Sequence, residues 1–417
     1  MQQDGPMRSV ADHQLAVESL LASLTDRAPE VLTDLAPMSL ARLGRRVLAD
    51  TVTSPIDLPP FDNSQMDGFA VRVADVTPGV ALPVGEPIPA GAEAGALEVG
   101  EARPIMTGAG VPAGADAIVR IEASVPPVFP PAGAWATVAF STAPEPGDFV
   151  RRRGSDVAAG AELLPAGTVL GPAQWGVLAA AGVTEVSVLA PLRVLLVSTG
   201  DELQESGSPL EPGRIYGANS TSLAVALADC GVDLVGVETV TDDAATLRRL
   251  LTRHSADVDL VITTGGVSKG AYEVVRDVLA PAGVDFVSVA LQPGGPQGLG
   301  LAALGQERVP VIALPGNPVS ALVSFEMFVR PVIRGLHGLP PHRPIERAPL
   351  AEAVDSSPVK LRVRRGVMDA AGMVHLVGGA GSHLLHGYAS STVLVHLPAA
   401  IDSLEAGDEV EIWRIDD

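Results

Sequence analysis

The chain has 417 residues, of which 47% are hydrophobic and 3% aromatic, and it contains 44 glycines and 36 prolines. This length predicts two to four domains, whose cores consist mainly of Ala, Val and Leu. The formal net charge of −21 argues against nonspecific binding to nucleic acid or to an anionic membrane, and the sequence has neither a membrane-spanning apolar run nor a signal-peptide core. We therefore expect a cytoplasmic protein that binds neither nucleic acid nor membrane.

The first part of the chain combines helical spacing with loops and short β-like runs. Apolar residues recur at helical spacing from Ser9 to Leu24, with Ser9 as a candidate N-cap, and again over 39–49. The stretch 54–71, SPIDLPPFDNSQMDGFAV, is too rich in proline for a regular element, and a long polar loop in a compact protein is usually functional. Residues 80–150 carry short β-like runs between Gly/Pro turns, which indicates a small β-rich domain.

From Leu192 onward, β-like runs alternate with helical ones. The predicted strands are 192–198, 234–240, 259–264, 284–290 and 309–315, and the predicted helices are 220–230, 242–254, 271–280 and 318–336. This alternation implies a mostly parallel sheet with right-handed crossovers. After a linker at 340–344, the tail alternates strand-like runs and predicts a small all-β domain.

These patterns predict a multidomain protein of the α/β plus β class. The predicted domains are 9–50 with 148–190 (a discontinuous helical and β linker-dimerisation domain), 51–147 (a loop-rich β insertion), 191–338 (α/β) and 345–417 (a small β-barrel). The apolar helix face of the first domain has little else to cover it, so we expect a homodimer formed through this domain and the α/β domain.

Three polar loops directly follow predicted strands of the sheet: STGDEL (198–203), TTGGVSKG (263–270) and LPGNPVS (314–320). The carboxyl ends of parallel strands meet at one edge of a sheet, where ligands bind in open α/β folds. Gly265 and Gly266 would allow positive φ and bring backbone N–H groups close to an anion. Three such loops on one edge predict a binding site more strongly than any one glycine turn.

Acidic residues near these loops have two interpretations. Asp201 and Glu202 either cap a helix or hold Mg²⁺ together with Asp259, because Mg²⁺ prefers carboxylates, water and phosphate. Asn317 and Pro318 likewise fit an N-cap followed by the first helical residue, and the same arrangement leaves free N–H groups facing a ligand.

Seven motifs, in order and spacing, resemble those of the MoeA family of molybdopterin molybdenumtransferases, and are similar also to the E domain of gephyrin. They are DLPPFDNSQMDGFAV, MTGAGVPAGADAIV, VRRRGSDVAAGAELLPAG, STGDEL, GRIYGANS, DLVITTGGVS and LPGNPVSALVSFEMFVRP. The resemblance implies a homodimer of four-domain subunits with a MogA-like α/β domain. It also implies Mg²⁺ or a similar divalent ion as cofactor, adenylylated molybdopterin and molybdate as substrates, and transient contacts with other molybdenum cofactor biosynthesis proteins.

The implied reaction inserts molybdate at the pterin dithiolene and releases AMP, in a cleft between the α/β domain of one subunit and the second domain of the other. Carried over by motif, the catalytic residues would be Asp67, Thr107 and Asp259. Substrate would be bound by Ser198, Thr199, Gly200, Gly265, Gly266, Ser268, Lys269, Pro315, Asn317 and Pro318. The metal ligands would be Asp156, Asp201, Glu202, Asp259 and Glu273.

The sequence departs from the family pattern in loops that would bind anions. The two lysines of a KPGKP-like motif are Gln292 and Gly295 here, and Gly217 replaces an acid. Lys269, one of only two lysines in the chain, would supply part of the lost charge, and Glu273 stands where the pattern has a shorter acid. Two alternatives therefore stay open: a molybdopterin-binding paralogue or scaffold with little turnover, and a MogA-type adenylyltransferase.

Overall fold

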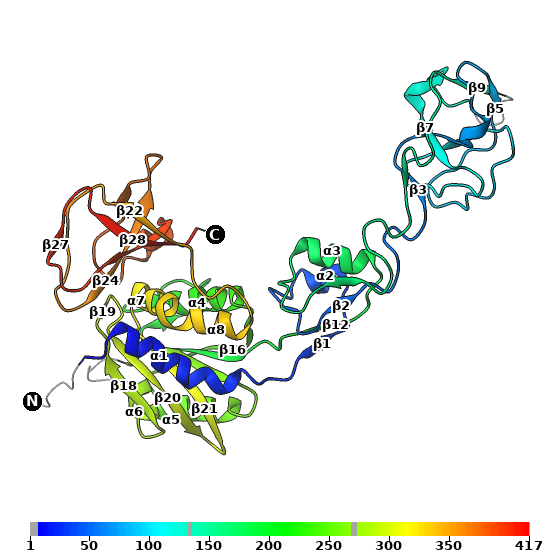
Figure 1. Ribbon diagram of the computed structural model, residues 1–417. Helices are drawn as coiled ribbons and strands as arrows, with labels where there is room; N and C mark the ends of the chain where they lie inside the picture. The colour runs from blue at the N-terminus through cyan, green and yellow to red at the C-terminus, as the bar shows by residue number, and fades with distance from the viewer. Residues whose placement is uncertain (1–6, 132–135, 268–272, 417) are drawn as a thin grey trace, which may run out of the picture. The chain divides into compact units, whose positions relative to one another are not determined.

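The computed structural model describes residues 7–131, 136–267 and 273–416, and the chain forms two compact units (Figure 1). One unit comprises Asp50–Val186, and the other comprises Met1–Ala49 together with Ser187–Asp417. No helix in the described part of the chain has the length and apolar character of a membrane span.

The unit 50–186 is built from short strands and long loops, as its Gly/Pro-rich sequence predicts. Its strands are β2 (Val52–Thr53), β3 (Asn63–Ser64), β4 (Gly68–Val71), β5 (Leu82–Pro83), β6 (Arg103–Ile105), β7 (Ala117–Arg120), β8 (Ser124–Val125), β9 (Thr137–Phe140), β10 (Val150–Arg151) and β11 (Glu162–Leu164). They form two three-stranded sheets, β6-β4-β7 and β5-β9-β8, and the pairs β10-β3 and β11-β2. Two single-turn helices, η2 (Val73–Asp75) and η3 (Ile121–Ala123), and the helix α3 (Pro172–Ala180) complete it.

The core of the other unit is a six-stranded sheet in the order β16-β13-β17-β21-β20-β18. Its strands are β13 (Arg193–Thr199), β16 (Asp233–Val240), β17 (Leu260–Thr264), β18 (Val284–Ser288), β20 (Pro296–Leu304) and β21 (Glu307–Leu314). The first four strands of that order are parallel to one another, and β20 runs antiparallel to both of its neighbours, β21 and β18. The sheet is thus mixed, and β20 was missed because its PQGLGLAAL sequence is rich in glycine.

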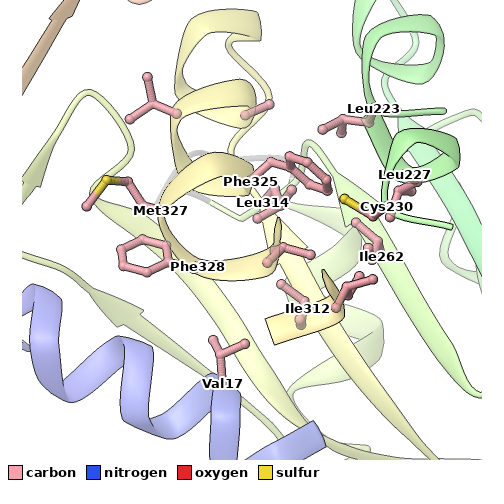
Figure 2. Packing of buried hydrophobic residues seen from close by; sticks show 14 of the residues in the cluster. Val17, Leu223, Leu227, Cys230, Ile262, Ile312, Leu314, Phe325, Met327 and Phe328 are labelled. Carbon is pink, nitrogen blue, oxygen red and sulfur yellow. The ribbon is translucent and has the colours of Figure 1, made fainter. Parts of the chain in front are cut away.

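Helices cover both faces of this sheet. They are α4 (Ala218–Asp229), α5 (Ala244–His254), α6 (Val274–Leu279), α7 (Pro318–Ser324), the π-helical η4 (Phe325–Val329) and α8 (Arg330–Leu336). Along β17, Leu260 and Ile262 belong to one core cluster, whereas Val261 belongs to the other. Figure 2 shows the first cluster, in which Ile262 packs with Leu227 of α4 and Phe325 of η4.

The helix α1 (Val10–Leu21) begins at Ser9, whose hydroxyl accepts a hydrogen bond from the backbone N–H of Asp12 at 3.0 Å. Its buried Val17 and Leu21 belong to the core cluster of the α/β sheet (Figure 2). The prediction that this apolar face is left uncovered by its own chain is therefore wrong. The predicted helix over 39–49 is also wrong, since only α2 (Pro37–Leu40) forms, and the chain then bends at Gly44, which has φ of 70°.

Further short elements belong to this part of the chain. They are η1 (Ala22–Leu24), β1 (Glu30–Leu32) paired with β12 (Val186–Val188), and β14 (Leu203–Gln204) paired with β15 (Ile215–Tyr216). The tail contains β22 (Ile345–Pro349), β23 (Val354–Asp355), β24 (Leu361–Met368), β25 (Val374–Leu376), α9 (Leu385–Ala389), β26 (Val393–Leu397), β27 (Ser403–Leu404) and β28 (Glu409–Arg414). Its main sheet has the order β19-β24-β26-β28-β22, in which β19 (Leu291–Gln292) comes from the α/β region. This pairing anchors the C-terminal β region to the α/β region.

Candidate functional site

A pocket of about 640 Å³ lies at the carboxyl ends of β13, β17 and β21. The three loops predicted from the sequence all contribute to its lining. The predicted site residues that line the pocket are Ser198, Thr199, Gly200, Glu202, Gly265, Gly266, Glu273, Pro315, Asn317 and Pro318. Because β17 lies between β13 and β21 in the sheet, the ends of the three strands are neighbours, and their loops converge as expected.

Two glycines at the end of β17 have backbone conformations that favour glycine. Gly265 has φ of 97°, and a Cβ there would lie 2.6 Å from the carbonyl oxygen of Thr199. Gly266 has φ of 60°, and its Cβ would lie 3.0 Å from the backbone nitrogen of Val275. The glycine pair therefore lets β17 turn sharply between the end of β13 and α6.

Asn219, in the first turn of α4, joins two of the converging loops. Its Nδ2 donates one hydrogen bond of 2.8 Å to Oγ1 of Thr264 and another of 2.7 Å to the carbonyl oxygen of Gly316. Thr264 Oγ1 in turn donates to the carbonyl oxygen of Pro315 at 2.9 Å. This network fixes the end of β17 to the LPGNP loop.

Two hydroxyl groups at the end of β13 are buried without a hydrogen-bond partner among the described residues. They belong to Ser198 and Thr199, which are 2% and 5% exposed and both line the pocket. Buried polar groups are normally satisfied, so these hydroxyls are candidate contacts for a bound polar ligand.

The charged side chains at one side of the pocket are acidic. Glu202, Asp242 and Glu273 line it, and partial burial, with repulsion from Asp201, Glu202 and Glu273, raises the pKa of Asp242. Asp201 does not line the pocket. Its carboxylate accepts a 3.0 Å hydrogen bond from the backbone N–H of Asp242. Within residues 7–131, 136–267 and 273–416, no group of three or more His, Cys, Asp or Glu side chains is arranged to hold a metal ion.

Asp259 lies at the opposite edge of the sheet from the pocket. It immediately precedes β17, and its carboxylate accepts hydrogen bonds from the backbone N–H of Arg193 at 2.8 Å and from the Arg193 guanidinium at 3.0 Å. The prediction that Asp259 lies near Asp201 and Glu202 is therefore wrong. The acid precedes the strand, whereas the pocket lies beyond its carboxyl end at Thr264.

Three predicted residues belong to the unit 50–186. Asp67 Oδ1 accepts hydrogen bonds of 2.7 Å from both the backbone N–H and the Oγ1 of Thr107, which hold the pKa of Asp67 below its usual range. Asp156 is exposed, three residues after Arg153, whose side chain pairs with Asp57. Asp67 of the MDG motif and Thr107 of the MTGA motif are thus in direct contact.

Comparisons with known proteins cover almost the whole chain. Residues 9–182 match the MoeA N-terminal region (domain I and II), 195–335 a probable molybdopterin binding domain, and 347–415 the MoeA C-terminal region (domain IV). A protein named molybdopterin molybdenumtransferase 2 from Mycobacterium tuberculosis (strain ATCC 25618 / H37Rv) is 44% identical, over 98% of this chain and 100% of that protein. The chain belongs to the MoeA family.

Other members of the MoeA family agree with this assignment. The molybdopterin molybdenumtransferase of Haemophilus influenzae is 34% identical over 90% of this chain and 92% of its own length. Among solved structures, a molybdopterin biosynthesis MoeA protein from Pyrococcus horikosii matches with a TM-score of 0.72 and 28% identity, over 98% of this chain and 99% of that one. The matches at both ends of the chain argue against the MogA-type alternative.

Sequence reasoning about this MoeA family member assigned no role to several pocket residues, among them Asn219, Asp242 and His383. Asp242 follows β16, so the rule that polar residues after parallel strands face the ligand would have found it. Asn219 lies in the GRIYGANS motif, but no local pattern places His383 of the C-terminal region in the pocket. Ser268 and Lys269 fall outside the described residues.

Proposed function

We propose that this chain is a molybdopterin molybdenumtransferase, which inserts molybdate at the dithiolene of adenylylated molybdopterin and releases AMP. The observation that carries the proposal is the convergence of three loops on one pocket, inside the region that matches a molybdopterin binding domain. The names of the relatives that match nearly the whole chain support the same activity.

In this proposal the pocket binds the ligand mainly through uncharged groups. The hydroxyls of Ser198 and Thr199 would hydrogen-bond its polar atoms, since both are buried without a described protein partner. Gly265 and Gly266 would let a phosphate or pterin approach the backbone, because glycine has no side chain and both residues line the pocket. Pro315 and Asn317 of the LPGNP loop would form the opposite wall, held by Asn219.

The donor chemistry of Glu202, Asp242 and Glu273 fits Mg²⁺, which prefers carboxylate oxygens. Burial is the main cause of the raised pKa of Asp242, and repulsion from neighbouring carboxylates, which a bound cation would relieve, adds to it. Because no group of three such side chains is arranged around a metal among the described residues, we propose only that one or two of these carboxylates would bind the ion, with water and substrate phosphate as its other ligands. When bound, Mg²⁺ would neutralise charge on the pyrophosphate.

The remaining assignments belong to the same proposal. Asp67 and Thr107 are proposed catalytic residues, and the hydrogen bonds from Thr107 would keep the Asp67 carboxylate ionised and oriented. We also propose a homodimer with transient contacts to other proteins of molybdenum cofactor biosynthesis. A sedimentation mass of one chain at micromolar concentration would contradict the dimer.

The test is to incubate the protein with adenylylated molybdopterin and Mg²⁺, with and without molybdate, and to follow AMP by chromatography. The proposal predicts AMP release that requires both molybdate and the divalent ion. AMP release that is independent of molybdate would instead indicate simple hydrolysis and would overturn it.

A non-catalytic molybdopterin-binding paralogue is the second candidate. It is favoured by Gln292 and Gly295 at positions where the family pattern has lysines, and by the lack of any Arg or Lys among the described residues that line the pocket. Tight binding of adenylylated molybdopterin without AMP release under the same conditions would support this candidate.

A further inference from the structure

The charge of the pocket poses a problem for an anionic ligand. Its described lining contains three carboxylates, on Glu202, Asp242 and Glu273, and a single side chain that can carry a positive charge, that of His383. Phosphate and molybdate are both tetrahedral oxyanions, which proteins usually bind through cationic groups and N–H donors. His383 is therefore the one described side chain of the lining that can offer such a ligand both an N–H donor and a positive charge.

His383 reaches the pocket from the C-terminal region, in the segment between β25 and α9. The neighbouring Ser382 accepts a 3.0 Å hydrogen bond at its carbonyl oxygen from the backbone N–H of Val319, in the first turn of α7. Because α7 directly follows the LPGNP loop, this bond ties the His383 segment to one wall of the pocket.

A buried arginine holds the same segment from the other side. Arg365 of β24 is 0% exposed, and its Nη2 donates to the carbonyl oxygens of Gly379 at 2.5 Å and Gly381 at 3.4 Å. An arginine is seldom fully buried, because removing its charge from water is costly unless hydrogen bonds compensate. The hydrogen bonds from Val319 and Arg365 therefore fix the backbone of the segment that carries the pocket-lining histidine.

We infer that His383 donates an N–H hydrogen bond to an oxyanion of the bound ligand, and thereby makes the C-terminal region part of the substrate site. A histidine can donate such a bond in either protonation state, and it adds positive charge when protonated. The inference rests on the proposed function and deepens it. The oxyanion belongs either to the adenylyl phosphate of the pterin substrate or to molybdate.

The test measures binding of two probes, AMP and sodium molybdate, by titration calorimetry to the parent protein and to His383→Ala. The inference predicts that His383→Ala weakens binding of one probe by about tenfold, which corresponds to the loss of one charge-assisted hydrogen bond. The affected probe identifies the oxyanion. His383→Arg should restore much of the affinity, because arginine supplies both N–H donors and charge.

His386→Ala is the matched control, since His386 is a histidine three residues away that does not line the pocket. It should bind both probes like the parent, and thermal unfolding should show that all variants are folded. Equal affinities of the parent and His383→Ala for both probes would overturn the inference, as would a parent that binds neither probe. Because these readouts involve no turnover, a parent that binds the probes but releases no AMP would contradict only the proposed function.

Discussion

The side-chain amide of Asn219 donates a 2.8 Å hydrogen bond to Oγ1 of Thr264, and so joins the beginning of α4 to the end of β17. A second bond of 2.7 Å from the same amide reaches the carbonyl oxygen of Gly316. One side chain therefore connects two of the loops that line the pocket.

Asn219→Asp should disturb this arrangement, because a carboxylate cannot donate to the Gly316 carbonyl oxygen. We expect a loss of about 1–3 kcal/mol in the free energy of unfolding and a reduced rate of AMP release. Urea unfolding and the AMP assay would check both effects. Ser220→Ala is the control, since the Ser220 hydroxyl makes only a local 3.1 Å bond to Gly217 and does not line the pocket. If Asn219→Asp kept the stability and activity of the parent, this role for Asn219 would be contradicted.

Asp259→Asn should leave AMP release within about twofold of the parent, because Asp259 pairs with Arg193 at the edge of the sheet opposite the pocket. The loss in stability should be about 1 kcal/mol or less, since Arg193 is half exposed and solvent screens the ion pair.

Glu202→Gln provides the contrast, because Glu202 lines the pocket. Because Glu202 is a proposed Mg²⁺ ligand, its replacement should lower AMP release at saturating substrate by at least about tenfold and raise the Mg²⁺ concentration that is needed for half-maximal activity. The reverse order, an inactive but stably folded Asp259→Asn and an active Glu202→Gln, would contradict our placement of the site.

Gly265→Ala should be strongly destabilising. Its φ of 97° is unfavourable for alanine, and the added Cβ would lie 2.6 Å from the Thr199 carbonyl oxygen. Backbone strain of this kind costs about 1–3 kcal/mol before the collision is counted, so we expect a clear drop in the unfolding midpoint. Gly176→Ala in α3 is the matched control. No heavy atom lies within 4 Å of a Cβ at that position, and alanine favours a helix, so this variant should be as stable as the parent or more so.

Stability should fall in mild acid because of buried histidines. His337 Nε2 accepts a 2.9 Å hydrogen bond from the backbone N–H of Leu192, and its Nδ1–H donates to the Cys230 carbonyl oxygen. Burial lowers the pKa of His337 from 6.5 to about 4. Between these values the unfolded chain binds a proton that the folded chain does not. The stabilisation is therefore complete above pH 6.5 and decreases as the pH falls toward 4, by about 1.4 kcal/mol per pH unit.

Urea unfolding between pH 7 and pH 5 would measure this slope, to which buried His13 and His396 also contribute, because burial lowers each pKa to about 4. His337→Gln should be less stable than the parent at pH 7. Its free energy of unfolding should also depend less steeply on pH, because about one proton fewer is taken up on unfolding. An identical slope in the parent and His337→Gln would contradict the assigned protonation.

The sequence predicted those features that depend on local pattern. The alternation of apolar runs and helices indicated the parallel strands, and the ends of β13, β17 and β21 marked the three predicted pocket loops, which include Gly265 and Pro315. Asp259 was wrongly placed at the pocket because it was grouped with acids that follow strands. It precedes β17, so it lies at the end of the strand away from the pocket. The strand β20 was hidden by its glycines, which pack against neighbouring atoms rather than interrupt the strand.

The rest depended on contacts between segments far apart in the chain. Val17 and Leu21 of α1 pack against the α/β sheet, whose first strand in the sequence begins at Arg193. The apolar face of a helix predicts that it is buried but not which segment it packs against. The C-terminal segment that carries His383 is joined to the α/β region by the pairing of β19 with β24 and by the hydrogen bond from Val319 to Ser382. Hydrophobic periodicity carries no information about such pairings.

The most direct test of the central claim is a crystal structure of the protein with adenylylated molybdopterin bound. We predict ligand density at the carboxyl ends of β13, β17 and β21, in contact with Thr199, the Gly265–Gly266 turn and the LPGNP loop. We also predict that an oxyanion of the substrates lies within hydrogen-bond distance of His383. Ligand density elsewhere in the molecule, with this pocket filled only by solvent, would contradict the proposed site.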